Sequence, residues 1–285
     1  MSTVEQITDP LATHGEGPVW HPGWPGLRWV DMLAGDVLEL DPVTQSVSRH
    51  PVGRVVAALR PRVDGGAVLA LERGFALADA TLASVRGLGE LWTDPGVRMN
   101  EGDCDPDGRF YCGSMAYDET PGAATLYRLD TDGAVTTVLS GVTISNGLAW
   151  SPDGATAYYV DTPTHRVDAF DYDRDGGLTG RRTLLRIPEE AGSPDGITVD
   201  ADGRLWIALW GGAAVRCYQP DGRLVEQLDL PVTQVTACTF GGPDLDELYI
   251  TTSRQDTDPD AQPEAGALFR VRPGVEGRPA RTYAG

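Results

Sequence analysis

Four oxygen-bearing side chains recur at one fixed offset from predicted tight turns in this chain of 285 residues. Glu16, Asn100, Asn146 and Asp195 each stand seven residues before such a turn. Carboxylate and amide oxygens are ligands of hard cations such as Ca²⁺, Mg²⁺ and Mn²⁺, although two carboxylates and an amide also bind Zn²⁺ or Fe²⁺. The spacing therefore predicts a ring of oxygens able to hold one divalent metal ion, whose identity stays open.

The offset recurs because the chain consists of six copies of one unit. The turns fall near Gly23, Asp64, Asp107, Asp153, Asp202 and Pro243, at spacings of 41, 43, 46, 49 and 41 residues. Each turn joins two short apolar strands, as Asp202-Gly203 does between 197–199 and 205–209. A four-stranded unit repeated every 40 to 50 residues or so is typical of β-propeller blades. The sequence predicts an all-β fold, a six-bladed β-propeller with four-stranded blades, as a single domain over residues 1–285.

In such a fold the innermost strand of each blade begins seven residues before its turn, close to the central axis. The six positions there are Glu16, Ala57, Asn100, Asn146, Asp195 and Thr236. The loops that follow the second strands return to the same mouth of the channel. They are Glu72-Arg73, 114–119, 161–165, 210–212 and 253–256. We also expect residues 4–7 to add an outer strand to the last blade, which would close the ring without an open sheet edge.

Composition excludes several classes of partner. The net charge of −19 opposes binding to nucleic acid or to an anionic membrane surface. There is no apolar run of 18 residues, and residues 1–10 lack the pattern of a signal peptide, so we expect a cytoplasmic protein with no obligate protein partner. The four cysteines show no C-x-x-C spacing, which predicts neither a disulfide nor a zinc cluster.

Two of the predicted ligands have a simpler explanation that must be weighed. Asn146-Gly147 and Asp195-Gly196 are residue pairs that often form hairpin turns. Each stands only seven residues before another tight turn, which leaves no room for both to reverse the chain, so a ligand role is favoured. The four histidines show no metal-binding spacing, and packing or surface positions are favoured for them. Only His165, in a loop of the open face, remains a candidate near a substrate.

The motifs resemble those of the regucalcin, senescence marker protein and gluconolactonase family. The matching segments are 15–20, 98–102, 145–151, 167–172, 194–196 and 262–269, in order and over essentially the whole chain. This resemblance implies a divalent-metal-dependent lactonase on a six-bladed propeller. It implies Glu16, Asn146 and Asp195 as metal ligands, with Arg98 and Asn100 contacting a sugar lactone. Animal members have a longer loop between the positions of Met115 and Leu126 that supplies an acidic group over the substrate, and whether Asp118 or Glu119 replaces that group stays open.

The leading hypothesis is hydrolysis of an aldonolactone to the aldonic acid. The metal would polarise the lactone carbonyl, Asp195 would act as the general base, and Arg98 and Asn100 would hold the sugar hydroxyls. One alternative is a non-catalytic calcium-binding propeller or scaffold, and another is a metal-dependent aryl-ester or phosphotriester hydrolase. The polar rim of the predicted site favours sugars over apolar esters. The sequence fixes neither the lactone and its ring size nor the oligomeric state.

Overall fold

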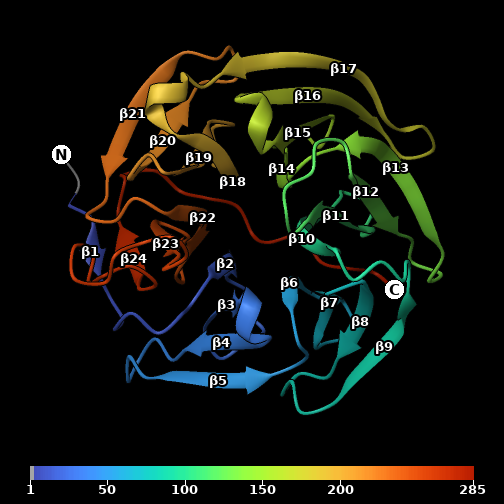
Figure 1. The fold of residues 1–285 in the computed structure, drawn as a ribbon, viewed down its shortest axis with the longest axis horizontal. Coiled ribbons are helices and arrows are strands. Elements are labelled where there is room, and N and C mark those ends of the chain that lie inside the picture. The colour runs from blue at the N-terminus through green and yellow to red at the C-terminus, as the bar shows by residue number, and fades with distance from the viewer. Residues whose placement is uncertain (1–2) are drawn as a thin grey trace.

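Six four-stranded antiparallel sheets stand in a ring in the computed structural model, which describes residues 3–285 (Figure 1). This arrangement confirms the predicted six-bladed propeller. Five of the sheets are simple meanders, with consecutive strands paired from the axis outward, and the sixth pairs β22, β23 and β24 with β1. Strands near the axis, such as β6 (Val56–Pro61), are buried along their whole length, whereas outermost strands such as β5 (Val47–Pro51) are largely exposed.

The first five blades each use four consecutive strands. Blade one contains β2 (Gly15–Val19), β3 (Leu27–Asp31), β4 (Asp36–Leu40) and β5; blade two contains β6, β7 (Ala67–Leu71), β8 (Gly74–Ala78) and β9 (Val85–Glu90); and blade three contains β10 (Val97–Cys104), β11 (Phe110–Ala116), β12 (Ala124–Leu129) and β13 (Val135–Val142). Blade four contains β14 (Ser145–Trp150), β15 (Thr156–Asp161), β16 (Arg166–Asp173) and β17 (Gly177–Arg186), and blade five contains β18 (Ser193–Val199), β19 (Leu205–Trp210), β20 (Ala214–Tyr218) and β21 (Leu224–Asp229). Short 3-10 helices η1 (Met32–Ala34), η2 (Thr162–Thr164) and η3 (Glu189–Ala191) lie in connecting loops.

The sixth blade combines strands from the beginning and the end of the described chain. Strands β22 (Val235–Gly241), β23 (Glu247–Thr252) and β24 (Leu268–Val271) are completed by β1 (Glu5–Gln6), which pairs with β24. Arg270 Nε also donates to Glu5 Oε1 at 2.9 Å across this pairing. The predicted closure of the ring by residues 4–7 is therefore confirmed.

Turns and core follow the expected pattern. The glycines of the Asp-Gly turns, such as Gly108 and Gly203, have φ angles of 77° and 85°, a region that costs glycine little. The core fills the wedges between blades, as where Trp206 packs edge-on against Phe240 with ring centroids 5.8 Å apart. All four cysteines are buried and free. Over residues 3–285, no helix is long and apolar enough to cross a bilayer.

A β-bulge interrupts the pairing of every innermost strand at the predicted axial position. The register shifts lie at Glu16/Val19, Val56/Ala58, Met99/Gly102, Ser145/Leu148, Pro194/Ile197 and Val235/Ala237. A bulge leaves one residue unpaired and redirects its side chain. In five strands this frees the axial residue from the ladder, whereas in β2 Glu16 stays paired with Val30 and the bulge follows it. Gly147 and Gly196 lie in these bulges and not in turns. A Cβ on Gly147 would stand 2.5 Å from the carbonyl oxygen of Asp195, so glycine lets the inner strands of neighbouring blades approach.

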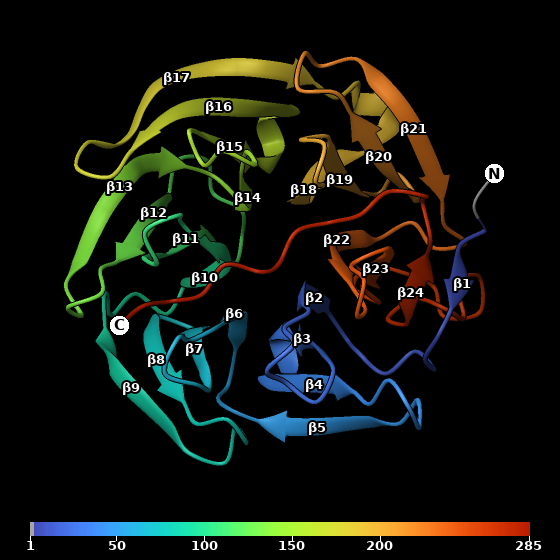
Figure 2. The same cartoon turned by 180° about the vertical axis from the view of Figure 1, so that it is seen from behind.

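The chain after β24 leaves the last blade and crosses the ring. Figure 2 views the ring from the face that is hidden in Figure 1, and there the segment passes in front of the centre. It runs from the sixth blade to the far side of the ring, near β6 and β10. We refer to residues 276–284 as the strap. The strap thus covers the mouth of the channel that lies opposite the beginnings of the innermost strands.

Candidate functional site

The three predicted metal ligands line one cavity of about 80 Å³. Glu16 comes from β2, Asn146 from β14 and Asp195 from β18, so three different blades contribute. All three are buried, with 3–5% of their surface exposed. Arg98 and Asn100 of β10 line the same cavity. The structure therefore brings together every residue that the sequence assigned to the site.

Two oxygen atoms in this cavity have no hydrogen-bond partner. Asn146 Oδ1 and Asp195 Oδ1 are both buried and unpaired among the described residues. Asn146 is held by its other end, because Nδ2 donates to Thr162 Oγ1 at 3.1 Å and Thr162 Oγ1 donates to the carbonyl oxygen of Pro194 at 3.0 Å. An unsatisfied buried acceptor costs about 1–3 kcal/mol. A bound cation would satisfy both oxygens at once.

Burial makes the two carboxylates difficult to ionise together. Loss of water raises the pKa of Glu16 from 4.5 to about 7, against the opposing effects of the Gly17 amide and the Arg98 charge. Burial, followed by the charges of Glu16 and Glu101, raises the pKa of Asp195 well above its ordinary value. A divalent cation favours both ionised forms, so the donor set of two carboxylates and one amide oxygen fits a hard metal ion. Within residues 3–285 no group of three His, Cys, Asp or Glu side chains is arranged to hold a metal, and in this cavity the Asn146 amide is the third oxygen donor beside the two carboxylates.

Arg98 and Asn100 form a connected pair. Arg98 Nη1 donates to Asn100 Oδ1 at 2.7 Å, and Asn100 Nδ2 donates to the carbonyl oxygen of Ser145 at 2.9 Å. The Arg98 guanidinium also lies over the Tyr117 ring, 5.7 Å from its centroid, and Arg98 Nε is buried without a partner. Both polar atoms of the Asn100 amide are thus engaged with protein. Asn100 is placed to orient Arg98, which keeps a free donor.

The two remaining ring positions carry no free ligand atom. Ala57 has no polar side chain, as the sequence indicated. Thr236 Oγ1 donates to the carbonyl oxygen of Gly15 at 2.6 Å and lies 2.9 Å from Thr251 Oγ1. This hydroxyl joins the sixth blade to the first. The oxygens available to a cation therefore come from blades one, four and five.

The rim of the cavity comes from the predicted loops. The lining residues Met115, Glu119, Thr162, Trp210 and Gln255 belong to loops that were expected to surround the ring. Glu119 lines the cavity, whereas Asp118 does not. Asp118 Oδ1 is occupied by the backbone and hydroxyl of Thr120, at 3.1 and 2.7 Å. Of the two acidic residues considered from sequence, Glu119 is the one in position to face a ligand.

His14 is a cavity residue that the sequence analysis missed. It lies 6% exposed, with Nδ1 2.9 Å from Ser253 Oγ and its ring edge-on to Trp210. Burial, then the Arg98 charge, lowers its pKa to about 3, so the ring is neutral. His165, the histidine that the sequence kept as a candidate near a substrate, directly follows η2 and is not among the lining residues. His14 stands two residues before Glu16, just as Arg98 precedes Asn100, and alternate residues of a strand share a face. That alternation was the available signal.

The chain is similar over nearly its whole length to known proteins. The family model described as the SMP-30/gluconolactonase/LRE-like region matches residues 14–254. Pentonolactonase XacC of Haloferax volcanii is 38% identical over 97% of each chain, and regucalcin of Danio rerio is 37% identical over 95% of each. The solved structure of the calcium-binding protein regucalcin from Agrobacterium tumefaciens superposes with a TM-score of 0.91, at 30% identity over 99% of this chain and 97% of the other.

The raised pKa of Glu16 gives a pH-dependent stability for the metal-free protein. Between pH 4.5 and about 7 the native state holds a proton that the unfolded chain has released, so the free energy of unfolding falls as pH rises. The full loss is about 3 kcal/mol. Glu16→Gln has no carboxyl group to titrate, so its free energy of unfolding should rise relative to that of the wild type between pH 4.5 and 8. Urea titrations of chelated protein measure this difference. A stability difference that does not change with pH would contradict the assigned pKa.

Proposed function

The chain belongs to the SMP-30/gluconolactonase/LRE-like family, and from this membership and its cavity we propose that it hydrolyses a sugar lactone to the aldonic acid. The observation that carries the proposal is the pair of unpaired buried oxygens, on Asn146 and Asp195, beside the Glu16 carboxylate. These three residues would hold one divalent metal ion. When bound, such an ion supplies Lewis-acid polarisation of the lactone carbonyl.

Asp195 is suited to act as the general base. Its Oδ1 has no partner in the protein, so the carboxylate is free to contact both a bound cation and the attacking water. It would accept a proton from the water that attacks the carbonyl carbon. The ring C–O bond of the lactone then breaks, and the released oxygen gains a proton to become the hydroxyl of the aldonic acid.

Arg98 is suited to bind the sugar and Asn100 to position it. Arg98 Nε is a buried donor without a partner, which an oxygen of the lactone would satisfy. The bond from Arg98 Nη1 to Asn100 Oδ1 fixes the guanidinium in one orientation. Neutral His14 and the indole of Trp210 provide an uncharged wall against the sugar ring. The mixture of fixed donors and an aromatic wall is typical of small-molecule sites.

A second candidate is calcium binding without catalysis. The structural relative from Agrobacterium is described as a calcium-binding protein, and the oxygen ligands would serve that role equally well. Both functions, lactone hydrolysis and calcium binding without catalysis, require that the protein bind a metal ion. Only the lactonase proposal expects release of acid from a sugar lactone, so a panel of pentono- and hexonolactones assayed with a pH indicator separates them.

Asn100 should act mainly through Arg98. Arg98→Ala should raise KM or lower kcat while metal content is kept, and Asn100→Ala should act in the same direction. Because the two share one hydrogen bond, the double variant should be little worse than Arg98→Ala, with an interaction energy of about 0.5–3 kcal/mol in kcat/KM. Fully additive effects would make the two residues independent. Loss of bound metal in both single variants would instead assign them to the ligand set.

Asp195 should be the most sensitive residue of the site. Asp195→Asn keeps the size and one ligand oxygen but removes the base, so kcat should fall by about 10² to 10⁴ even with the metal site saturated. Asn146→Asp is the matched control, because it replaces an amide by a carboxylate at the neighbouring ligand, whereas Asp195→Asn replaces a carboxylate by an amide. It keeps the base and should retain measurable turnover. Both rates are measured together with metal occupancy, and near-normal kcat in Asp195→Asn at full occupancy would assign proton transfer to another group.

A further inference from the structure

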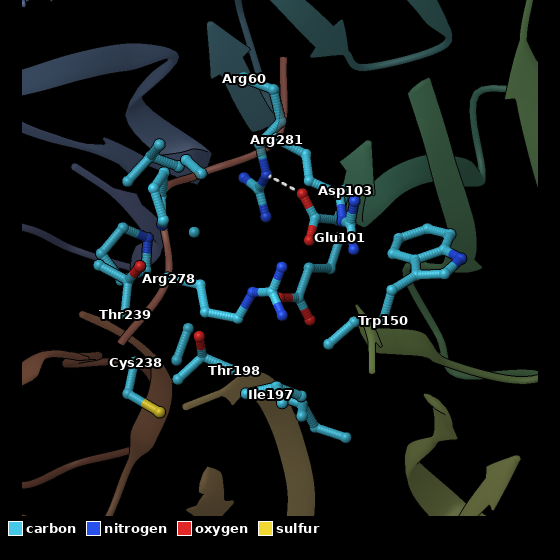
Figure 3. A pocket seen from close by; sticks show the side chains of 18 residues that line it. Arg60, Glu101, Asp103, Trp150, Ile197, Thr198, Cys238, Thr239, Arg278 and Arg281 are labelled. Carbon is cyan, nitrogen blue, oxygen red and sulfur yellow. Dashed lines mark hydrogen bonds and ion pairs between the residues drawn. The ribbon is translucent and has the colours of Figure 1, made fainter. Parts of the chain in front are cut away.

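A second cavity, of about 120 Å³, lies at the opposite mouth of the channel (Figure 3). Its walls are the far ends of the innermost strands together with the strap. It lies back to back with the proposed lactone site, since Gly17 and Glu101 line it while Glu16 and Asn100, the residues just before them, line the other. No step of the proposed hydrolysis uses this cavity.

The strap is held firmly on both sides of this mouth. Ala201 N donates to the carbonyl oxygen of Glu276 at 2.9 Å, which ties the strap to blade five. At the other end Tyr283 N donates to the Pro61 carbonyl oxygen at 2.8 Å, and Ala284 N donates to that of Gly108 at 2.9 Å. The buried Tyr283 ring adds a further anchor. The intervening residues 278–282 are therefore fixed across the opening (Figure 2).

Three arginines line the cavity, and two of them have no partner. Arg60 is paired, with Nε 2.5 Å from Asp103 Oδ1. Arg278 and Arg281 of the strap are half-buried, and neither forms a hydrogen bond or an ion pair with any described residue. Figure 3 shows Arg278 reaching from the strap into the middle of the pocket. Other arginines without a side-chain partner, such as Arg86 and Arg223, are exposed, whereas these two line a cavity.

The charge of the cavity is positive. Three guanidinium groups face two carboxylates, those of Glu101 and Asp103, so a net positive charge remains even when both carboxylates are ionised. Because the Asp103 carboxylate is engaged by Arg60, the charges of Arg278 and Arg281 are only partly balanced by Glu101. Half-buried cations in a small cavity are weakly screened, which favours an anionic ligand.

We propose that this cavity binds a small oxyanion, with the guanidinium groups of Arg278 and Arg281 as its main donors. The planar fork of a guanidinium matches the paired oxygens of a phosphate or a carboxylate, and such charge-assisted bonds are among the strongest hydrogen bonds in proteins. The hydroxyl of Thr198, which lines the same cavity, can add a neutral donor. One water needs roughly 10–15 Å³ of such space, so 120 Å³ accommodates an ion of several atoms.

Two kinds of oxyanion have the required paired oxygens: inorganic phosphate and the carboxylate of a sugar acid. Both are tested on the metal-free protein, freed of chelator by dialysis, so the result does not depend on lactone hydrolysis. Thermal unfolding is followed with phosphate, with gluconate and with chloride at matched ionic strength. An anion that binds the native state alone should raise Tm by on the order of 5 °C at a hundredfold excess over Kd. A rise with phosphate only, or with gluconate only, identifies the source, and equal curves in all three salts would overturn the proposal.

Variants then locate the site. Arg278→Gln/Arg281→Gln should remove the shift, and calorimetric titration of each single variant should give at least a tenfold weaker Kd. The matched control is Arg86→Gln/Arg223→Gln, which removes the same charge from two exposed arginines and should keep the shift. Arg98→Gln should also keep it, because Arg98 lies in the other cavity.

Folding of the strap variants is checked independently. If the double variant loses the native circular dichroism spectrum, Arg278→Lys keeps the charge without the fork and should bind the anion more weakly than the wild type while remaining folded. Retention of the full shift in the strap variants, or its loss in Arg98→Gln, would place the anion elsewhere and overturn the proposal.

Discussion

The β-bulge at the beginning of each innermost strand is the constraint on which the rest of the structure depends. Regular pairing would commit these residues to the sheet ladder and direct their side chains between the blades. In five of these strands the bulge releases the axial residue from the ladder, and in β2 the bulge begins directly after the axial residue Glu16. What occupies the released position then decides its use. Ala57 and Thr236 complete the ring, whereas Asn146 and Asp195 each keep one oxygen that the protein itself does not satisfy, beside the Glu16 carboxylate.

The cost of this arrangement explains why the site favours a cation. Two carboxylates and an amide oxygen are buried together, and their environment opposes ionisation of both acids. The nearest fixed positive group is Arg98, whose own burial lowers the pKa of its guanidinium. A single arginine held by Asn100 does not supply the two charges that the carboxylates lack. A divalent ion would, and the neutral His14 and Trp210 beside it would add no competing charge.

The sequence predicted the architecture and the ring because both leave a periodic signal. The offset of seven residues before each turn reflects the fixed length of the innermost hairpin, so it located Glu16, Asn146 and Asp195 without a structure. The loops that provide Glu119 and Trp210 followed from strand direction. His14 was missed because histidine spacing was searched for metal motifs, whereas its position depends on the alternation of side chains along β2. The strap was missed because residues 276–284 have no strand periodicity, and only the fold shows that they cross the channel.

Lactone hydrolysis by this propeller should need a divalent cation held by the ring. The most direct measurement is acid release from a sugar lactone by the same protein sample as purified, after exhaustive chelation, and after return of Ca²⁺, Mn²⁺ or Zn²⁺, with circular dichroism recorded at each stage. We expect chelation to abolish hydrolysis and at least one cation to restore it. The β-sheet spectrum should stay unchanged, because the propeller is closed by its own strands. Undiminished hydrolysis by the fully chelated protein would contradict it.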